Sequence, residues 1–181
     1  MPDGVASDLD QRTLLHTVAD RLNIVADHLP LPHQLGPDPA VGEVLDDEIR
    51  NLAGLLTYLA GESAIHHRDT ARARHRPQAA DRFAALALAR AARPTGAALA
   101  ALAAAVHDLG VLADLTRRAA GPRRTAPVTA ACHSLVDDVA SARTHLAHAA
   151  KLLRTAADTR TTPATTAVPP PTATTRTSRT R

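Results

Sequence analysis

The chain has 181 residues and a mass of 19.0 kDa, and its 45% of hydrophobic residues includes only 1% aromatic residues, so an alanine- and leucine-rich helical core is expected. The net charge of +3 and the pI of about 9.9 are no evidence of a basic nucleic-acid-binding domain, because residues 159–181 alone hold four arginines and no acidic residue. The single cysteine, Cys132, excludes an internal disulfide.

The first helix is predicted over residues 7–29, where leucine and valine recur three and four residues apart on one helical face. Four prolines within residues 30–39 end it. A second helix is expected from about Glu43, with acidic residues in its first turns, as the helix dipole favours, and with its end between Gly61 and Arg74. The two predicted apolar stripes are Leu15, Val18, Leu22, Val25 and Leu29, and then Leu45, Ile49, Leu52, Leu56 and Leu59.

A third helical region is predicted over residues 78–120, with a turn at residues 121–124. Its apolar residues form two stripes in different registers, the first marked by Phe83 and Leu86 and the second by Leu102 and Leu109. Pro94 lies between them, so we expect either a kink or a full break there. The longest apolar run, residues 97–106, is about half of the roughly 20 residues that span a bilayer. With no secretory signal in the first ten residues, a cytoplasmic protein without membrane contact is expected.

The last helix is predicted over residues 127–158, where apolar residues alternate four and three apart without interruption. Residues 159–181 show no such period and are rich in threonine, proline and arginine, so they are predicted to be a disordered tail. Short connections place successive helices antiparallel. We therefore predict an all-α protein, with an antiparallel four-helix bundle over residues 1–158 followed by the tail.

A basic cluster surrounds the end of the second helix, in the sequence "HHRDTARARHRP" at residues 66–77. Residues 1–62 hold three arginines against eleven acidic residues, whereas residues 63–124 hold eleven against four. We interpret the cluster as a solvated helix end that neutralises the acidic start of the first helix. The alternative is a nucleic-acid contact. The cluster has none of the aromatic residues that stack on single-stranded bases, which speaks against this alternative. The candidate arginines, which include a second cluster at the opposite end of the bundle, are Arg68, Arg72, Arg74, Arg76, Arg117, Arg118, Arg123 and Arg124.

Metal and catalytic sites are the weakest candidates. Glu62 and His66 share one helical face, and His16 and His148 are the residues that neighbouring helices offer as further ligands. The Glu and His three residues apart on two helices that mark di-iron bundles are absent from the sequence, and only His66 lies on an apolar stripe. Cys132 and the adjacent His133 point about 100° apart on a helix and form no nucleophile–base pair. We expect no metal, no cofactor and no enzymatic activity.

The leading hypothesis is a non-enzymatic helical protein that acts through helix-mediated contacts with a protein partner or with a second copy of itself. A first helix of about 22 residues does not cover a last helix of about 32, so part of the apolar stripe on the last helix is expected to be free for a partner. The alternative is a DNA-associated accessory protein that uses the arginine clusters and the basic tail. The third hypothesis is a metal-binding helical bundle.

Overall fold

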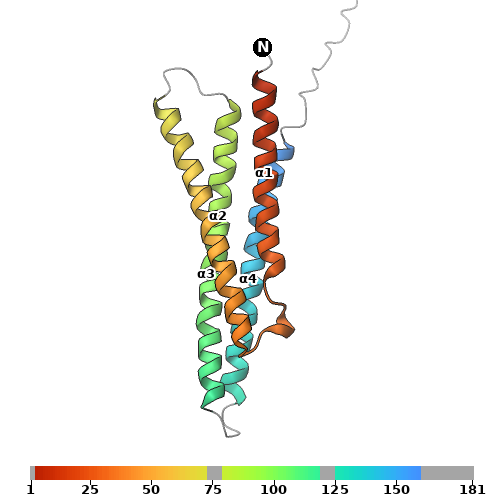
Figure 1. Cartoon of the computed structure of the whole chain (residues 1–181), viewed down its shortest axis with the longest axis vertical. Helices are drawn as coiled ribbons and strands as arrows, with labels where there is room; N and C mark the ends of the chain where they lie inside the picture. The colour runs from red at the N-terminus through yellow and green to blue at the C-terminus, as the bar shows by residue number, and fades with distance from the viewer. Residues whose placement is uncertain (1–2, 73–78, 119–124, 160–181) are drawn as a thin grey trace, which may run out of the picture.

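A computed structural model describes residues 3–72, 79–118 and 125–159, and within these ranges it confirms the predicted all-α antiparallel bundle (Figure 1). Four α-helices run alternately in opposite directions, joined after the first by a short 3-10 helix, and the described residues contain no strand. The predicted tail lies outside the described residues except for Thr159. The elements are α1 (Asp3–His28), η1 (Pro32–Gln34), α2 (Pro39–Arg72), α3 (Ala79–Arg117) and α4 (Thr125–Asp158).

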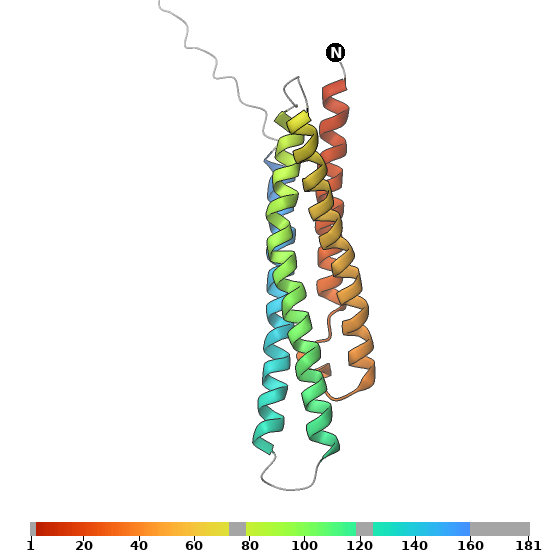
Figure 2. The same ribbon diagram turned by 90° about the vertical axis from the view of Figure 1, so that its left-hand side faces the viewer.

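In Figure 2, α3 and α4 lie on one side of the bundle and α1 and α2 on the other. α3 packs on α4 most extensively, α1 packs on α4 and α2 on α3, whereas α1 and α2 contact each other less. α3 and α4 also extend beyond η1 at the end of the molecule that is distant from the start of α1 (Figures 1 and 2). Their surface on the side away from α1 and α2 is called here the outer α3/α4 face.

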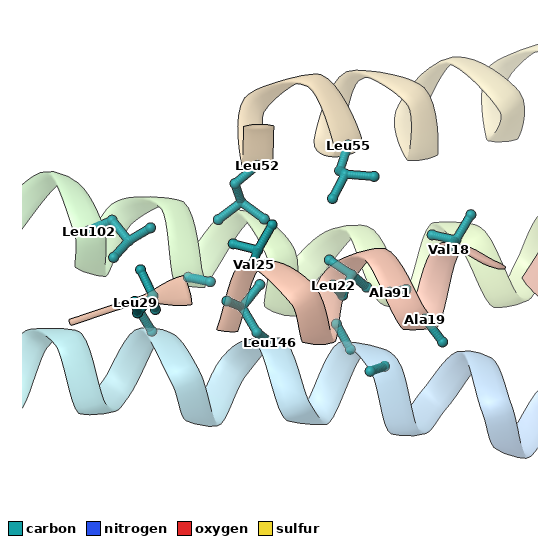
Figure 3. Packing of buried hydrophobic residues seen from close by; sticks show 14 of the residues in the cluster. Val18, Ala19, Leu22, Val25, Leu29, Leu52, Leu55, Ala91, Leu102 and Leu146 are labelled. Atoms are coloured by element: carbon teal, nitrogen blue, oxygen red, sulfur yellow. The ribbon is translucent and has the colours of Figure 1, made fainter. Parts of the chain in front are cut away.

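Leucines from all four helices meet in the core (Figure 3). Leu22 of α1, Leu52 of α2, Leu102 of α3 and Leu146 of α4 are fully buried, and Val25 fills the space between them. Each buried leucine contributes about 1.5–3 kcal/mol to the free energy of unfolding. The stripe predicted on α1 is buried throughout, and those predicted on α2 and α4 are buried or half-buried.

α3 is one continuous helix, so of the two alternatives predicted at Pro94, a kink or a full break, the full break does not occur. Its core-facing row runs through the proline in a single register, and Thr95 is buried next to it, with its hydroxyl donating to the Ala91 carbonyl oxygen at 2.8 Å. The stripe predicted from Phe83 and Leu86 is wrong, because these side chains are 36% and 48% exposed. The core-facing residues of α3 are Ala84, Leu88, Ala91, Thr95, Ala98, Leu102, Ala105 and Leu112.

Polar contacts fix the end of α1 against its neighbours. The guanidinium of Arg143 on α4 donates to the carbonyl oxygens of Ala26 (3.3 Å), Leu29 and Pro30 (3.1 Å), which satisfies carbonyls that a helix end leaves without backbone partners. On the other side, His28 Nδ1 lies 3.0 Å from Glu48 Oε1 of α2. The ion pairs that join α1 to other helices therefore use α2 and α4, and none that the described residues show uses an arginine of residues 63–124.

Candidate protein-binding groove

The outer α3/α4 face contains a groove formed by two adjoining depressions of about 440 and 650 Å³. Arg90, His148 and Leu152 line both, so the depressions form one continuous surface, called here the outer groove. Its floor is apolar along its whole length. The apolar lining residues are Phe83, Leu86, Ala87, Ala89, Pro94 and Ala97 of α3 and Leu152 and Ala156 of α4.

The polar rim of the outer groove is cationic. Arg90, Arg93, Lys151 and His148 are exposed around it, His145 is half-buried, and none of the described residues that line it is acidic. Within the described part of the chain, the two arginines and the lysine form no ion pair. The groove therefore combines an apolar floor with positive charge that nothing described neutralises.

The composition of α3 explains why the floor is apolar. The stretch Arg82–Arg117 is long and apolar enough to cross a membrane by length and composition alone, a test that the core helix of a soluble protein also passes. Only 22% of its most apolar window is buried, so much of this apolar surface lies outside the core. Phe83 and Leu86 lie in this exposed part, and large exposed apolar patches mark interaction sites more often than they are neutral.

The same outer face turns acidic towards the end of α3 and the start of α4. Asp108 follows Pro94 by two heptads, and Asp138 precedes Leu152 by two heptads, so both belong to the rows that line the outer groove. Burial raises the pKa of Asp138 above its usual 3.8, and the nearby carboxylates of Asp108 and Asp137 raise it further. No described basic side chain forms an ion pair with these three carboxylates.

A second, smaller pocket of about 260 Å³ lies between α1 and α2 beside Glu48. The Glu48 side chain is only 7% exposed, and its oxygens contact His28 Nδ1 at 3.0 Å and Asn51 Nδ2 at 3.2 Å. Both carboxylate oxygens of Glu48 therefore have partners, and the contact with His28 joins α2 to α1 at this pocket. Sequence reasoning missed Glu48, although its position three residues after Leu45 and four before Leu52 placed it on the buried face.

Tyr58 of α2 lies near Arg21, which also lines this pocket. Burial raises the pKa of its hydroxyl, and the carboxylate of Glu62 raises it further, whereas Arg21 of α1 opposes the shift. A tyrosine with a raised pKa stays protonated at neutral pH and is no base.

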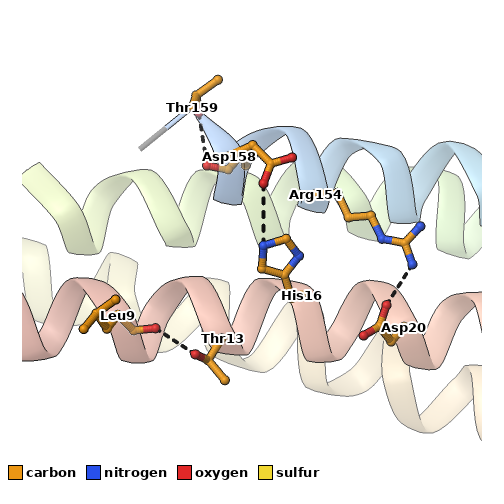
Figure 4. Close-up of polar contacts among 8 residues, drawn as sticks. Leu9, Thr13, His16, Asp20, Arg154, Asp158 and Thr159 are labelled. Atoms are coloured by element: carbon orange, nitrogen blue, oxygen red, sulfur yellow. Dashed lines mark hydrogen bonds and ion pairs between the residues drawn. The ribbon is translucent and has the colours of Figure 1, made fainter. Parts of the chain in front are cut away.

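The residues considered as metal ligands are dispersed in the structure. His16 Nε2 lies 3.6 Å from Asp158 Oδ1, at the level of the last turn of α4 (Figure 4). His148 lies on the outer groove ten residues before Asp158, or about 15 Å along α4, Glu62 is half-buried on α2, and the side chain of His66 lies outside the described part. Among the side chains that are described, no three histidine, cysteine or acidic residues are grouped to hold a metal ion.

Of the arginines considered for nucleic-acid binding, Arg68 lies towards the end of α2 and Arg117 and Arg118 lie at the end of α3, at opposite ends of the bundle (Figure 1). Arg68 is exposed. Arg117 Nε donates to the Ala113 carbonyl oxygen at 3.3 Å, and Arg118 Nε pairs with Asp114 at 2.9 Å, so both bind their own helix. The remaining side chains lie outside the described part, namely those of Arg72, Arg74, Arg76, Arg123 and Arg124.

The apolar stripe of α4 that was expected to be free for a partner is not exposed in the structure. The large exposed hydrophobic side chains that are described belong to α1, α2, α3 and the first connection, and none belongs to α4. α3 has 39 residues and covers the part of α4 that α1, with 26, does not reach, so Val128 and Cys132 are half-buried against the core. The prediction failed because it treated α1 as the only cover for α4.

Comparison with known proteins does not assign a function to the chain. No family model matches the chain, no curated protein matches it, and no solved structure matches it. The class that the fold and the groove define is an all-α bundle with an apolar, cationic surface groove.

Proposed function

We propose that the protein is a non-enzymatic binding protein whose outer groove accepts an amphipathic helix with apolar residues on one face and acidic residues beside them. The observation that supports this proposal is the apolar floor surrounded by Arg90, Arg93 and Lys151, which form no ion pair among the described residues. Apolar anchors spaced three and four residues apart would lie on the floor. The cationic rim would attract acidic flanks and select against basic ones.

The dimensions of the groove suit a helical ligand. Its lining extends over residues 83–97 of α3 and 145–159 of α4, which is about 20 Å at 1.5 Å per residue, or four helical turns. The depressions are open to solvent and lie between two antiparallel helices, as in other helix-in-groove sites. His145 and His148 line the groove, and no acidic residue among the described lining orients them, which supports binding rather than catalysis.

The acidic half of the outer face favours a protein ligand over nucleic acid or an anionic membrane. Asp108, Asp137 and Asp138 continue the rows of the groove, and phosphates that extended past the cationic half would meet these carboxylates. A helix of about four turns fits within the cationic half alone. The DNA-associated alternative does not involve the outer groove and depends on the two arginine clusters of the sequence.

Fluorescence anisotropy with a labelled peptide tests the proposal. The probe is an acidic peptide of about 14 residues, four helical turns, with leucines at i, i+3, i+4 and i+7, and its control is a scrambled peptide of equal composition. The protein is the full chain with Asp108→Asn, Asp137→Asn and Asp138→Asn, which removes the repulsive carboxylates and leaves the groove intact. We expect saturable, salt-sensitive binding of the patterned peptide only.

A matched pair of variants locates the binding. Leu86→Glu in the same background puts a carboxylate in the groove and is expected to weaken binding at least about tenfold, equal to 1.4 kcal/mol. Leu9→Glu changes a leucine that is 55% exposed on α1 and should leave binding unchanged. Equal affinity for the patterned and scrambled peptides, or equal effects of the two variants, contradicts the proposal.

A further inference from the structure

The cationic and acidic halves of the outer α3/α4 face are arranged symmetrically along the helices. On α3, Arg90 and Arg93 lie on one side of Ala100, and Asp108 lies at a similar separation on the other. On α4, Lys151 and the pair Asp137–Asp138 lie on either side of Thr144. Because Ala97 lines the groove with His145, Ala100 and Thr144 are at nearly the same height on the antiparallel helices.

We infer that the helices that occupy the outer groove belong to the outer α3/α4 face of a second copy of this chain, in an antiparallel two-fold dimer. The axis lies in the interface, crosses both helices, and passes near Ala100 and Thr144. This inference rests on the proposed function of the groove and names its ligand. A two-fold contact uses the same patch on both copies, so the patch must be complementary to itself.

The charges meet this condition in the antiparallel orientation. Rotation about the axis places Arg90 and Arg93 of one copy opposite Asp108 of the other, and Lys151 opposite Asp137 and Asp138, and each set of pairs occurs twice. A parallel dimer would instead place cations against cations and carboxylates against carboxylates. Like charges across an interface cost several kcal/mol, so the charges specify the orientation.

The acidic half of the outer α3/α4 face carries both the apolar and the acidic side chains that the groove requires of its ligand. Val111, in the same heptad row as Ala97 and Ala104, is 38% exposed and supplies an apolar side chain beside Asp108. The rotation brings Val111 of one copy to Ala89 and Arg90 of the other. The ligand is thus an apolar and acidic helix surface within the chain itself.

The centre of the face allows close approach. Ala100 and Ala104 are exposed and Ala97 is half-buried, and such small side chains let helices pack at the short end of the usual 8–10 Å range. The face extends over about 35 residues of α3, which gives about 50 Å by about 15 Å, or roughly 750 Å² per partner. That area is close to the approximately 800 Å² per partner of a stable, specific complex.

Charge reversal tests the dimer in solution with the full chain. The cation-reversed variant carries Arg90→Glu, Arg93→Glu and Lys151→Glu, and the acid-reversed variant carries Asp108→Arg, Asp137→Arg and Asp138→Arg. Sedimentation velocity is expected to show a wild-type dimer, and a dimer Kd at least about 100-fold weaker for each variant alone. An equimolar mixture should restore a one-to-one complex, which also shows that both variants are folded.

The outcomes separate this inference from the proposed function. A wild-type chain that stays monomeric at the highest concentration, or variants that dimerise as well as the wild type, overturns the inference. Saturable binding of the patterned peptide would then leave the proposed function standing, whereas loss of that binding as well removes both. Flotation of monomers with phosphatidylglycerol vesicles, but not with phosphatidylcholine vesicles, would identify the face as a membrane contact and also overturn the inference.

Discussion

The Arg143 guanidinium donates a hydrogen bond of 3.1 Å to the Pro30 carbonyl oxygen, although 113 residues separate the two in sequence. The same side chain also reaches the carbonyl oxygens of Ala26 and Leu29. The last carbonyls of α1 lie next to four prolines of the following segment, which cannot donate backbone hydrogen bonds. A side chain from α4 replaces those donors, so the end of α1 is defined by a tertiary contact.

Arg143→Ala is expected to lower the free energy of unfolding by about 1–3 kcal/mol, because it leaves part-buried carbonyls without donors. Arg143→Lys should recover only part of the loss, since an ammonium does not reproduce the planar fork of a guanidinium. Urea unfolding followed by circular dichroism measures both. Thr129→Ala, at an exposed position of α4 two heptads before Arg143 and away from the outer α3/α4 face, is the control and should change stability by less than about 0.5 kcal/mol. Equal effects at the two positions would contradict the capping role.

Glu48→Ala is expected to destabilise the protein by about 1–3 kcal/mol, because Glu48 is buried and accepts from Asn51 while it contacts His28. A double-mutant cycle with His28→Ala should give a coupling energy of about 0.5–3 kcal/mol. Glu43→Ala, at an exposed position in the first turns of α2, is the control. A coupling energy of zero would show that the contact does not join α1 to α2.

Asp138→Asn is expected to raise the thermal stability of the monomer at neutral pH, by less than about 1 kcal/mol, because it removes repulsion from Asp108 and Asp137. The folded pKa of Asp138 is raised above 3.8, so the folded state favours the protonated acid. The destabilisation is therefore complete above the folded pKa and is lost as the pH falls through it. Melting curves of the two proteins should differ most at neutral pH and converge on acidification. A constant difference would contradict the shift.

Pro94→Ala is expected to raise the free energy of unfolding by about 2 kcal/mol. Proline inside a helix costs about 3 kcal/mol through the missing N–H and the clash with the preceding turn, here at the Arg90 carbonyl, and about 1 kcal/mol returns through the restricted unfolded chain. Thermal and urea unfolding measure the change. A destabilised variant would show instead that the Pro94 ring is needed for the packing of α3.

Sequence periodicity predicted the helices and most of the core because leucine and alanine spacing reports directly which face of a helix is buried. It placed the end of the last helix at residue 158, where α4 ends. It failed at Phe83 and Leu86, because it assumes that large apolar residues face inward, whereas the core of α3 is built largely from alanine there. That failure produced the apparent change of register at Pro94.

The outer groove could not be predicted from the sequence for a related reason. Arg90 and Arg93 belong to neither arginine cluster, and only the pairing of α3 with α4 brings them beside Lys151. The repeated spacing of Asp108 and Asp138 relative to the groove residues is visible in the sequence. It acquires meaning only when the two helices are known to be antiparallel neighbours, because the facing residues come from different parts of the chain.

The most direct test of the two-fold contact is disulfide trapping at its axis in the full chain with Cys132→Ser. Ala100→Cys places a thiol near the axis, whereas Ala89→Cys places one on the same face about 16 Å along α3 and therefore about 33 Å from its symmetry mate. Under mild oxidation, the dimer described here gives rapid intermolecular crosslinking through position 100 and little through position 89. Comparable crosslinking at the two positions, or more at position 89, would contradict it.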